Sequence, residues 1–138
     1  MRQSSTTLTL TAPAPGLHLV TREVAGWVEE QGMSEGLLTL FIRHTSASLL
    51  IQENAASAAR RDLERWLARI APEASVYEHD EEGPDDMPAH LRSALTATSL
   101  GIPVIGGKMA LGTWQGIYLC EHRRRPSERE VVLHLLGE

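Results

Sequence analysis

The sequence has little of several features that mark common protein classes. Its 138 residues include one cysteine, Cys120, so no disulfide can form within the chain and a reducing compartment fits. Lysine and arginine number 13 against 18 aspartate and glutamate residues, and the net charge of −5 excludes a broad basic surface for nucleic acid. No apolar run approaches the ~20 residues that span a bilayer. The first seven residues lack the apolar core of a signal peptide. We therefore expect a cytoplasmic protein that binds neither nucleic acid nor membrane.

Familiar catalytic signatures are also missing. The sequence contains no nucleophile elbow, phosphate loop or dinucleotide fingerprint, and Gly106-Gly107-Lys108 lacks the spacing of a Walker loop. Cys120 has no basic neighbour that would activate it, which predicts a buried, inert thiol. What is present is a hydrophobic fraction of 42% and a charged fraction of 22%, typical of a folded globular chain. The length suits one domain, over residues 1–138.

Hydrophobic periodicity predicts more strands than helices. Period-two alternation or β-forming residues predict strands at 7–11, 37–42, 47–51, 102–105, 113–122 and 131–136. Helical spacing predicts one helix over 17–32, a second that Asn54 caps and Pro72 ends, and a short third segment at 91–100. Residues 77–90 are acidic and predict a long irregular loop. Short connections favour antiparallel pairing, so we expect an α+β fold with a largely antiparallel sheet and two main helices.

Three histidines suggest a metal site. His44 ends a predicted strand and opens a run of hydroxyls at Thr45 and Ser46, which suits a metal ligand, a general base or an anion clamp; the alternative is a surface histidine. His79 and His90 flank the acidic loop, which could bring both rings to one point. Three imidazoles plus water form an open zinc shell, although the spacing matches no compact zinc motif. Magnesium on the loop carboxylates is the other possibility, and so is a solvated loop without any ion.

The turn at Thr113-Trp114-Gln115 offers a second cluster. Its hydroxyl, indole and amide lie beside glycines that permit close backbone approach, and the indole gives a flat surface for a heteroaromatic ring. A glycine-rich turn with a core tryptophan explains the same residues equally well.

Glu121 stands out because it shares a strand face with Ile117 and Leu119, an apolar stripe. A carboxylate there needs a partner or its pKa rises, so it is a candidate ligand or proton-transfer group. Arg123, in the basic run that follows, suits phosphate capture, although a solvated charge run is the alternative.

Together these residues resemble the YjbQ family, in blocks that follow the family's order over nearly the whole chain: 44–49, 53–55, 77–80, 83–90, 110–116 and 121–122. The resemblance implies a single α+β domain that assembles as a homotrimer. Family members are described as secondary thiamine-phosphate synthases, which couple a hydroxymethylpyrimidine diphosphate to a thiazole phosphate and release pyrophosphate, as a side activity. The family's polar site, associated with metal or oxyanion, matches six residues of this chain: His44, Ser46, His79, His90, Gln115 and Glu121.

The sequence thus predicts one composite site, whose residues take three roles. The expected metal ligands, for a divalent ion such as zinc or magnesium, are His44, His79 and His90. The expected catalytic groups are His44, Gln115 and Glu121. The expected contacts to a small-molecule phosphate ester are Thr45, Ser46, Thr113, Trp114 and Arg123. The alternatives to thiamine-phosphate synthesis are a trimer that binds a metal or phosphate ester without catalysis, and a metal-dependent hydrolase.

Overall fold

The computed structural model describes residues 1–74 and 76–138, and within these residues the chain forms eight strands and three helices. In chain order they are β1 (Arg2–Leu10), β2 (Gly16–Leu19), α1 (Thr21–Glu30), β3 (Glu35–Ile42), β4 (Ala47–Glu53), α2 (Ser57–Ile70), α3 (Asp86–Leu95), β5 (Ser99–Ile105), β6 (Lys108–Met109), β7 (Gln115–Glu121) and β8 (Arg129–Gly137). Every strand pair is antiparallel, so the predicted α+β class is confirmed. None of the described helices has the length and apolar character that a membrane span requires.

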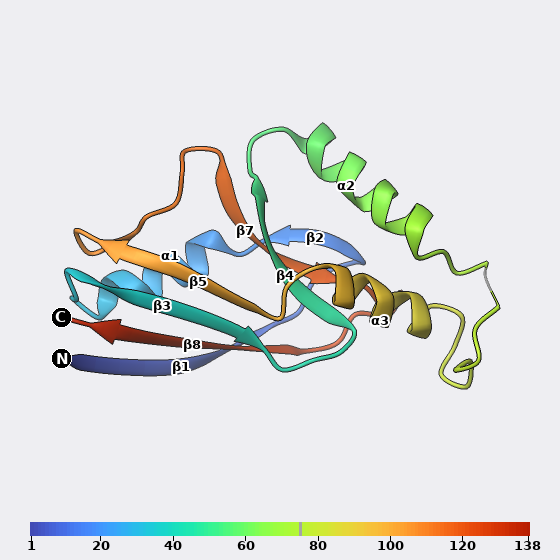
Figure 1. Cartoon of the computed structure of the whole chain (residues 1–138), viewed down its shortest axis with the longest axis horizontal. Coiled ribbons are helices and arrows are strands. Elements are labelled where there is room, and N and C mark those ends of the chain that lie inside the picture. Colours follow the sequence, from blue (N-terminus) through green and yellow to red (C-terminus); the bar gives the residue numbers. More distant parts are fainter. Residues whose placement is uncertain (75) are drawn as a thin grey trace.

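The larger sheet has five strands in the order β1-β8-β3-β5-β6. Figure 1 shows its long strands running side by side, with both ends of the chain at the same edge of the molecule. The alternation of these strands sends Leu38, Leu40 and Leu133 into the main core, where each is fully buried. The opposite face of the sheet carries partly exposed apolar side chains, among them Leu37 and Phe41.

The smaller sheet, in the order β2-β7-β4, crosses the larger one (Figure 1). Both of its faces carry packed apolar side chains. Its inner face packs Leu49, Ile117 and Leu119 against the larger sheet and against α1 in one core. Its outer face carries Tyr118 and Cys120, which pack under α2 in a second, smaller cluster. This arrangement places the end of β7 between the main core and the two helices α2 and α3.

Two predicted elements differ from the structure. Residues 17–19 belong to β2 and not to a helix, because Leu17 and His18 pair with Cys120 and Leu119 of β7. The expected loop at 77–90 contains the start of a third helix, α3, which includes the segment 91–95. Pro88 lies in the first turn of α3, where its missing N–H breaks no helical hydrogen bond.

Asn54 does not cap α2, contrary to the sequence-based expectation. Its side-chain amide donates to the carbonyls of Thr113 and Gln115 at 3.3 and 3.1 Å. The Glu53 carboxylate accepts the amides that precede the helix, from Ala55 and Ala56, at 2.9 and 2.7 Å. Asn54 therefore fastens the turn before β7 to the end of β4.

Candidate functional site

Three side chains around the start of α3 form a cluster of possible metal ligands, called the metal-type cluster below: His79, Asp86 and His90. Asp86 and His90 lie one helical turn apart, and His79 reaches them from the preceding loop. Nε2 of His79 and Nε2 of His90 each lie 3.2 Å from Oδ2 of Asp86. One ligand atom from each residue falls within 4.8 Å of the others. The aspartate side chain is 4% exposed and the two rings are 51% and 30% exposed, so the cluster opens to solvent on its histidine side.

The partners of these residues fix their orientation. Arg123 donates from Nη1 to Oδ1 of Asp86 at 2.8 Å, while Oδ2 is buried and forms no hydrogen bond with the described residues. Nδ1 of His90 lies 3.0 Å from the carbonyl oxygen of Thr45, which can only accept, so the ring carries its proton on Nδ1. In the neutral ring Nε2 then presents a lone pair toward Oδ2 of Asp86. The segment that begins at His44 therefore supports the cluster through a backbone carbonyl.

The side chain of Arg123 is hydrogen-bonded to the loop around this cluster. Besides Asp86, its guanidinium donates to Asp85 at 3.0 Å and to the carbonyl of Glu82 at 3.0 Å. Burial raises the pKa of the Asp85 carboxyl, but hydrogen bonds from the Arg124 amide and from Arg123 outweigh it and hold this pKa below its usual value. These contacts argue against the predicted role of Arg123 in phosphate binding. It is a positioning residue for the two aspartates.

Glu121 has the partner that its apolar strand face demands. Its two oxygens accept from Nε and Nη2 of Arg129 at 2.9 and 2.6 Å, and the side chains are 0% and 5% exposed. Burial alone would raise the pKa of Glu121, but the hydrogen bonds from Arg129 lower it below the usual value. The amide of Arg123 donates to the same carboxylate at 3.2 Å. A carboxylate with these contacts is ionised and fully satisfied, which argues against the expected role in proton transfer.

His44 lies beside this ion pair and not in the metal-type cluster. Its Nε2 accepts the amide of Glu130 at 2.8 Å, and Nδ1 lies 3.5 Å from Nη1 of Arg129. Burial, and then the charge of Arg129, lower the pKa of His44 below its usual value, so the ring is neutral. Of the three predicted metal ligands, the structure brings together His79 and His90, with Asp86 in the place of His44.

An open depression of about 530 Å³ lies at the end of β3, and none of the three candidate metal ligands lines it. It is lined by residues that include His44, Thr45, Ser46 and Arg43. Thr45 connects the two features, because its carbonyl accepts from His90 while the residue also lines the depression. Two of the predicted phosphate-binding residues, Thr45 and Ser46, therefore border a depression that Thr45 links to His90.

The turn that contains Thr113 and Trp114 lies at the far end of β7. Within the smaller sheet Gln115 pairs with Glu53 and Glu121 pairs with Ala47, six residues along the strand. At about 3.3 Å per residue this separates the two groups by about 20 Å. The side-chain oxygen of Gln115 accepts the amide of Gly112 at 2.7 Å, and Trp114 is 64% exposed. Within one chain, the predicted composite site is thus two separate groups.

Asp86 is the site residue that sequence reasoning missed. It is one of several acidic residues in a segment that was expected to be irregular. Without a predicted helix, its position four residues before His90 does not indicate that the two side chains lie on one face. The available signal was the proline at position 88, which is typical of a first helical turn and places residues 86 and 90 on one face.

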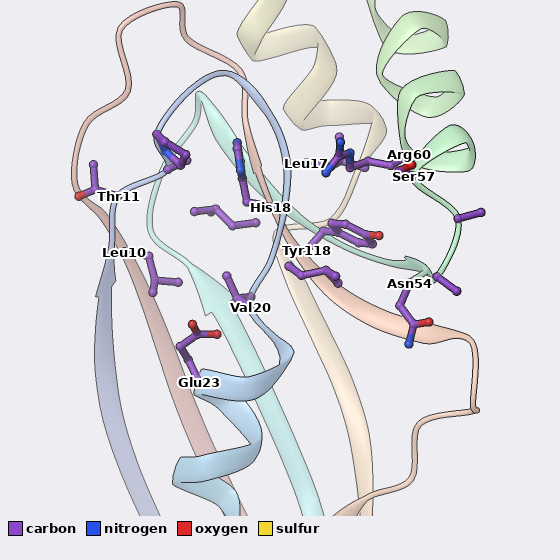
Figure 2. Close-up of a pocket in the computed structure, with 16 residues that line it drawn as sticks. Leu10, Thr11, Leu17, His18, Val20, Glu23, Asn54, Ser57, Arg60 and Tyr118 are labelled. Carbon is purple, nitrogen blue, oxygen red and sulfur yellow. The ribbon is translucent and has the colours of Figure 1, made fainter.

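A cavity elsewhere in the fold contains none of the predicted site residues. It measures about 440 Å³ and lies between β2, the segment before it and the start of α2. Figure 2 shows His18, Arg60 and Tyr118 around it. Nε2 of His18 lies 2.6 Å from the carbonyl oxygen of Ala14, so this histidine has a structural partner.

Comparisons with known proteins agree with this fold. The profile of the family described as "UPF0047 protein YjbQ-like" matches residues 6–138. The chain is 48% identical to the UPF0047 protein sll1880 of Synechocystis, over 99% of this chain and 94% of that protein. It is 46% identical to the UPF0047 protein YjbQ of Escherichia coli O157:H7, over 96% of each. A solved structure of an uncharacterized YjbQ/UPF0047 protein from Clostridium acetobutylicum superposes with a TM-score of 0.86 at 32% identity, covering 95% of this chain and 99% of the other. This chain belongs to the YjbQ (UPF0047) family.

Proposed function

We propose that this chain is a metal-dependent enzyme that acts on a small phosphate ester, with the metal ion held by His79, Asp86 and His90. The observation that carries the proposal is the buried Oδ2 of Asp86, which faces two imidazole nitrogens at 3.2 Å and has no hydrogen bond from the described residues. When the His90 ring is neutral with its proton on Nδ1, the lone pair of Nε2 faces this oxygen with no proton between the two atoms. A cation between them binds both and satisfies the buried oxygen.

The donor set favours zinc over magnesium. Two imidazoles and one carboxylate are a set that catalytic zinc uses, with a further position open, whereas magnesium prefers oxygen ligands. His79 is 51% exposed and leaves the cluster open toward solvent, where its Nε2 also lies 3.1 Å from Oε2 of Glu82. When bound, such an ion polarises a phosphoryl oxygen and lowers the pKa of attached water, which suits hydrolysis of an ester.

The surrounding residues have defined tasks in this proposal. Arg123 holds Oδ1 of Asp86, and the Thr45 carbonyl orients the ring of His90, as outer partners of metal ligands commonly do. Thr45 and Ser46 border the depression of about 530 Å³, where their hydroxyl and backbone groups can bind the substrate phosphate. His44 lines the same depression as a neutral ring.

Coupling of a pyrimidine diphosphate to a thiazole phosphate is the second candidate. Trp114 supports it, because its indole is 64% exposed and can stack on a pyrimidine. In a single chain this indole lies at the wrong end of β7 for the metal-type cluster, so the reaction needs Trp114 from a second copy. A homotrimer would supply it. The exposed apolar residues on the outer face of the large sheet support self-association: Leu37, Phe41, Ile105 and Leu136.

The metal proposal is tested by titrating chelator-treated protein with Zn²⁺ and Mg²⁺. We expect one Zn²⁺ per chain, and Asp86→Asn should weaken its binding by more than about 100-fold, since loss of an outer partner already costs 10–100-fold. The matched control is Asp80→Asn, which removes the same charge from the exposed part of the same loop. Equal zinc affinities for the two variants would refute the site.

Turnover separates the two candidate reactions. Zinc-loaded protein should release phosphate from 4-nitrophenyl phosphate, and His90→Ala should remove this activity. The pyrimidine diphosphate and the thiazole phosphate, supplied with either metal ion, should yield thiamine phosphate only if the coupling reaction occurs. A protein that binds zinc and yields neither product is a binding protein, and the enzymatic part of the proposal is then wrong.

A further inference from the structure

A cavity of about 270 Å³ lies on the outer side of the smaller sheet, away from the metal-type cluster. Its lining combines the segment around the start of β2, the α2 residues Glu64 and Leu67, Arg92 of α3, and Glu121 and His122 at the end of β7. None of the three candidate metal ligands is among the residues that line it. An arginine and a histidine thus face one small, partly open cavity that the proposed function does not use.

Arg92 brings to this cavity a positive charge that has no close ion-pair partner in the described chain, although the lining also holds Glu64 and Glu121. Its Nη2 donates to the carbonyl of Ala71 at 2.9 Å, at the end of α2. Its Nε is buried and has no hydrogen-bond partner in the described chain. Within residues 1–74 and 76–138, no carboxylate oxygen lies within 4.0 Å of its guanidinium. A guanidinium with a single hydrogen bond keeps donor groups that an acceptor entering the cavity can use.

His122 contributes a second polar atom to the same space. The residue is 5% exposed, and its Nε2 is hydrogen-bonded to the hydroxyl of Ser48 at 2.8 Å. Nδ1 has no hydrogen-bond partner among the residues that the structure describes. Because the hydroxyl of Thr96 is in turn hydrogen-bonded to Ser48, the ring is held in place and Nδ1 is the nitrogen that a ligand can reach.

We propose that this cavity binds a compact molecule that carries one oxyanion group, a carboxylate or a phosphate, between Arg92 and His122. Its volume lies below the ~300–1,000 Å³ of pockets for drug-sized ligands, so the ligand is small. Glu64 and Glu121 line the same cavity and repel a second negative group. The ligand is therefore anionic at one end only.

Binding of an anion here is coupled to a proton. Burial, and next the charge of Arg92, lower the pKa of His122 to about 4, so the empty site holds a neutral ring. The other charged groups around the ring are Glu121 of β7, Arg129 of β8 and Glu64 of α2. An oxyanion beside Nδ1 stabilises the protonated imidazole, so His122 takes up a proton as the anion binds and affinity rises as pH falls.

The test follows the ¹⁵N signals of the His122 ring while chelator-treated protein is titrated with sodium acetate or with inorganic phosphate. The chelator removes metal, so that phosphate cannot report on the other site. We expect saturable shifts of His122 with at least one of the two anions, and the anion that gives the tighter binding identifies the headgroup. The absence of saturable shifts with both anions would overturn the proposal.

Three variants are expected to change the affinity for the anion in different ways. Arg92→Met should weaken binding at least about tenfold, since it removes a charge-assisted hydrogen bond. Glu64→Gln should strengthen binding, because it removes the repulsive charge and keeps an acceptor for the Leu17 amide, which Glu64 accepts at 2.9 Å. Arg69→Met removes the same charge as the first variant from an exposed position near the end of α2 and should leave binding unchanged.

Two of the expected results cannot come from a misfolded variant. Glu64→Gln is expected to tighten binding, an effect that a damaged fold cannot produce. Acetate affinity should also increase between pH 8 and pH 6, and His122→Asn should abolish the increase. Equal affinities for Arg92→Met and Arg69→Met, or a His122→Asn variant with the wild-type pH dependence, would show that the anion binds without these residues.

Discussion

Two buried carboxylates, Glu121 and Asp86, differ in how completely their oxygens are satisfied. Both oxygens of Glu121 accept from the Arg129 guanidinium, with a backbone amide in addition. Asp86 receives one hydrogen bond, from Arg123, and its second oxygen faces two imidazole nitrogens without a hydrogen bond from the described residues. The first side chain is 0% exposed and the second 4%, so burial alone does not distinguish them.

The difference separates a structural ion pair from a binding site. A buried ion pair whose oxygens all accept hydrogen bonds cannot bind a ligand as well, and breaking it lowers the free energy of unfolding. An unsaturated oxygen is retained at a cost to the fold, and a bound ion or ligand is a common reason for that cost. Sequence reasoning gave the chemical role to Glu121, whereas the structure gives the unsatisfied oxygen to Asp86.

Breaking the ion pair should have the largest effect on stability. Glu121→Leu leaves Arg129 buried without a counterion, and we expect the free energy of unfolding to fall by about 3–5 kcal/mol. Asp86→Asn keeps an acceptor for Arg123, so it should cost only about 1–2 kcal/mol in the absence of metal. Urea denaturation followed by circular dichroism measures both values.

The double variant Glu121→Leu with Arg129→Met is the control for this comparison. It replaces both charges with apolar groups and should regain much of the lost stability. If Asp86→Asn destabilised the metal-free protein as much as Glu121→Leu does, the contrast between the two carboxylates would be wrong.

A pH dependence of stability should come from His122, the residue that follows Glu121. Burial, and then the charge of Arg92, lower the pKa of His122 from 6.5 to about 4 in the folded chain. The unfolded chain therefore binds a proton that the folded chain does not, and the free energy of unfolding falls as pH drops from 6.5 toward 4. The loss from this residue is up to about 3 kcal/mol.

Denaturation curves at several pH values measure this effect. The variant His122→Gln should show a flatter dependence between pH 6.5 and pH 4 than the wild type. His44, whose pKa is also lowered by its burial, contributes in the same direction and remains in both proteins. Parallel curves for the two proteins would mean that His122 titrates normally.

The smallest effect on stability is expected at the other end of β7. Trp114 is 64% exposed, so Trp114→Ala should change the free energy of unfolding by no more than about 0.5 kcal/mol. Its effect on the coupling reaction should instead be large, if that reaction occurs, because the indole is the proposed stacking surface. A strongly destabilised Trp114→Ala variant would indicate that this side chain is covered, for instance by another copy of the chain.

Strand predictions were accurate where alternation reflects a sheet with one buried face. The expected strands at 37–42 and 47–51 lie within β3 and β4, because Leu38, Leu40 and Leu49 pack into the core at period two. The predicted helix over 17–32 began too early. Leu17 and Val20 continue the helical spacing of α1, but both are buried for reasons of sheet and core packing that local periodicity does not record.

The site was predicted in part. The sequence placed His79 and His90 together, and the structure confirms that they share one cluster. It could not separate Gln115 from Glu121, because both belong to one strand and the distance between their ends depends on strand geometry. It could not assign a partner to Glu121 either. Arg129 follows eight residues later, after a loop that brings β8 back beside the same core.

The order of strands in the large sheet has a consequence for how the chain folds. β8 lies between β1 and β3, so the strand nearest the C-terminus pairs with two strands from the first third of the sequence. Contacts between such distant segments lower folding rates, because long loops must close before the pairing stabilises them. During synthesis β1 and β3 therefore emerge without their shared neighbour, and their unpaired backbone N–H and C=O groups must avoid pairing with other chains until β8 leaves the ribosome.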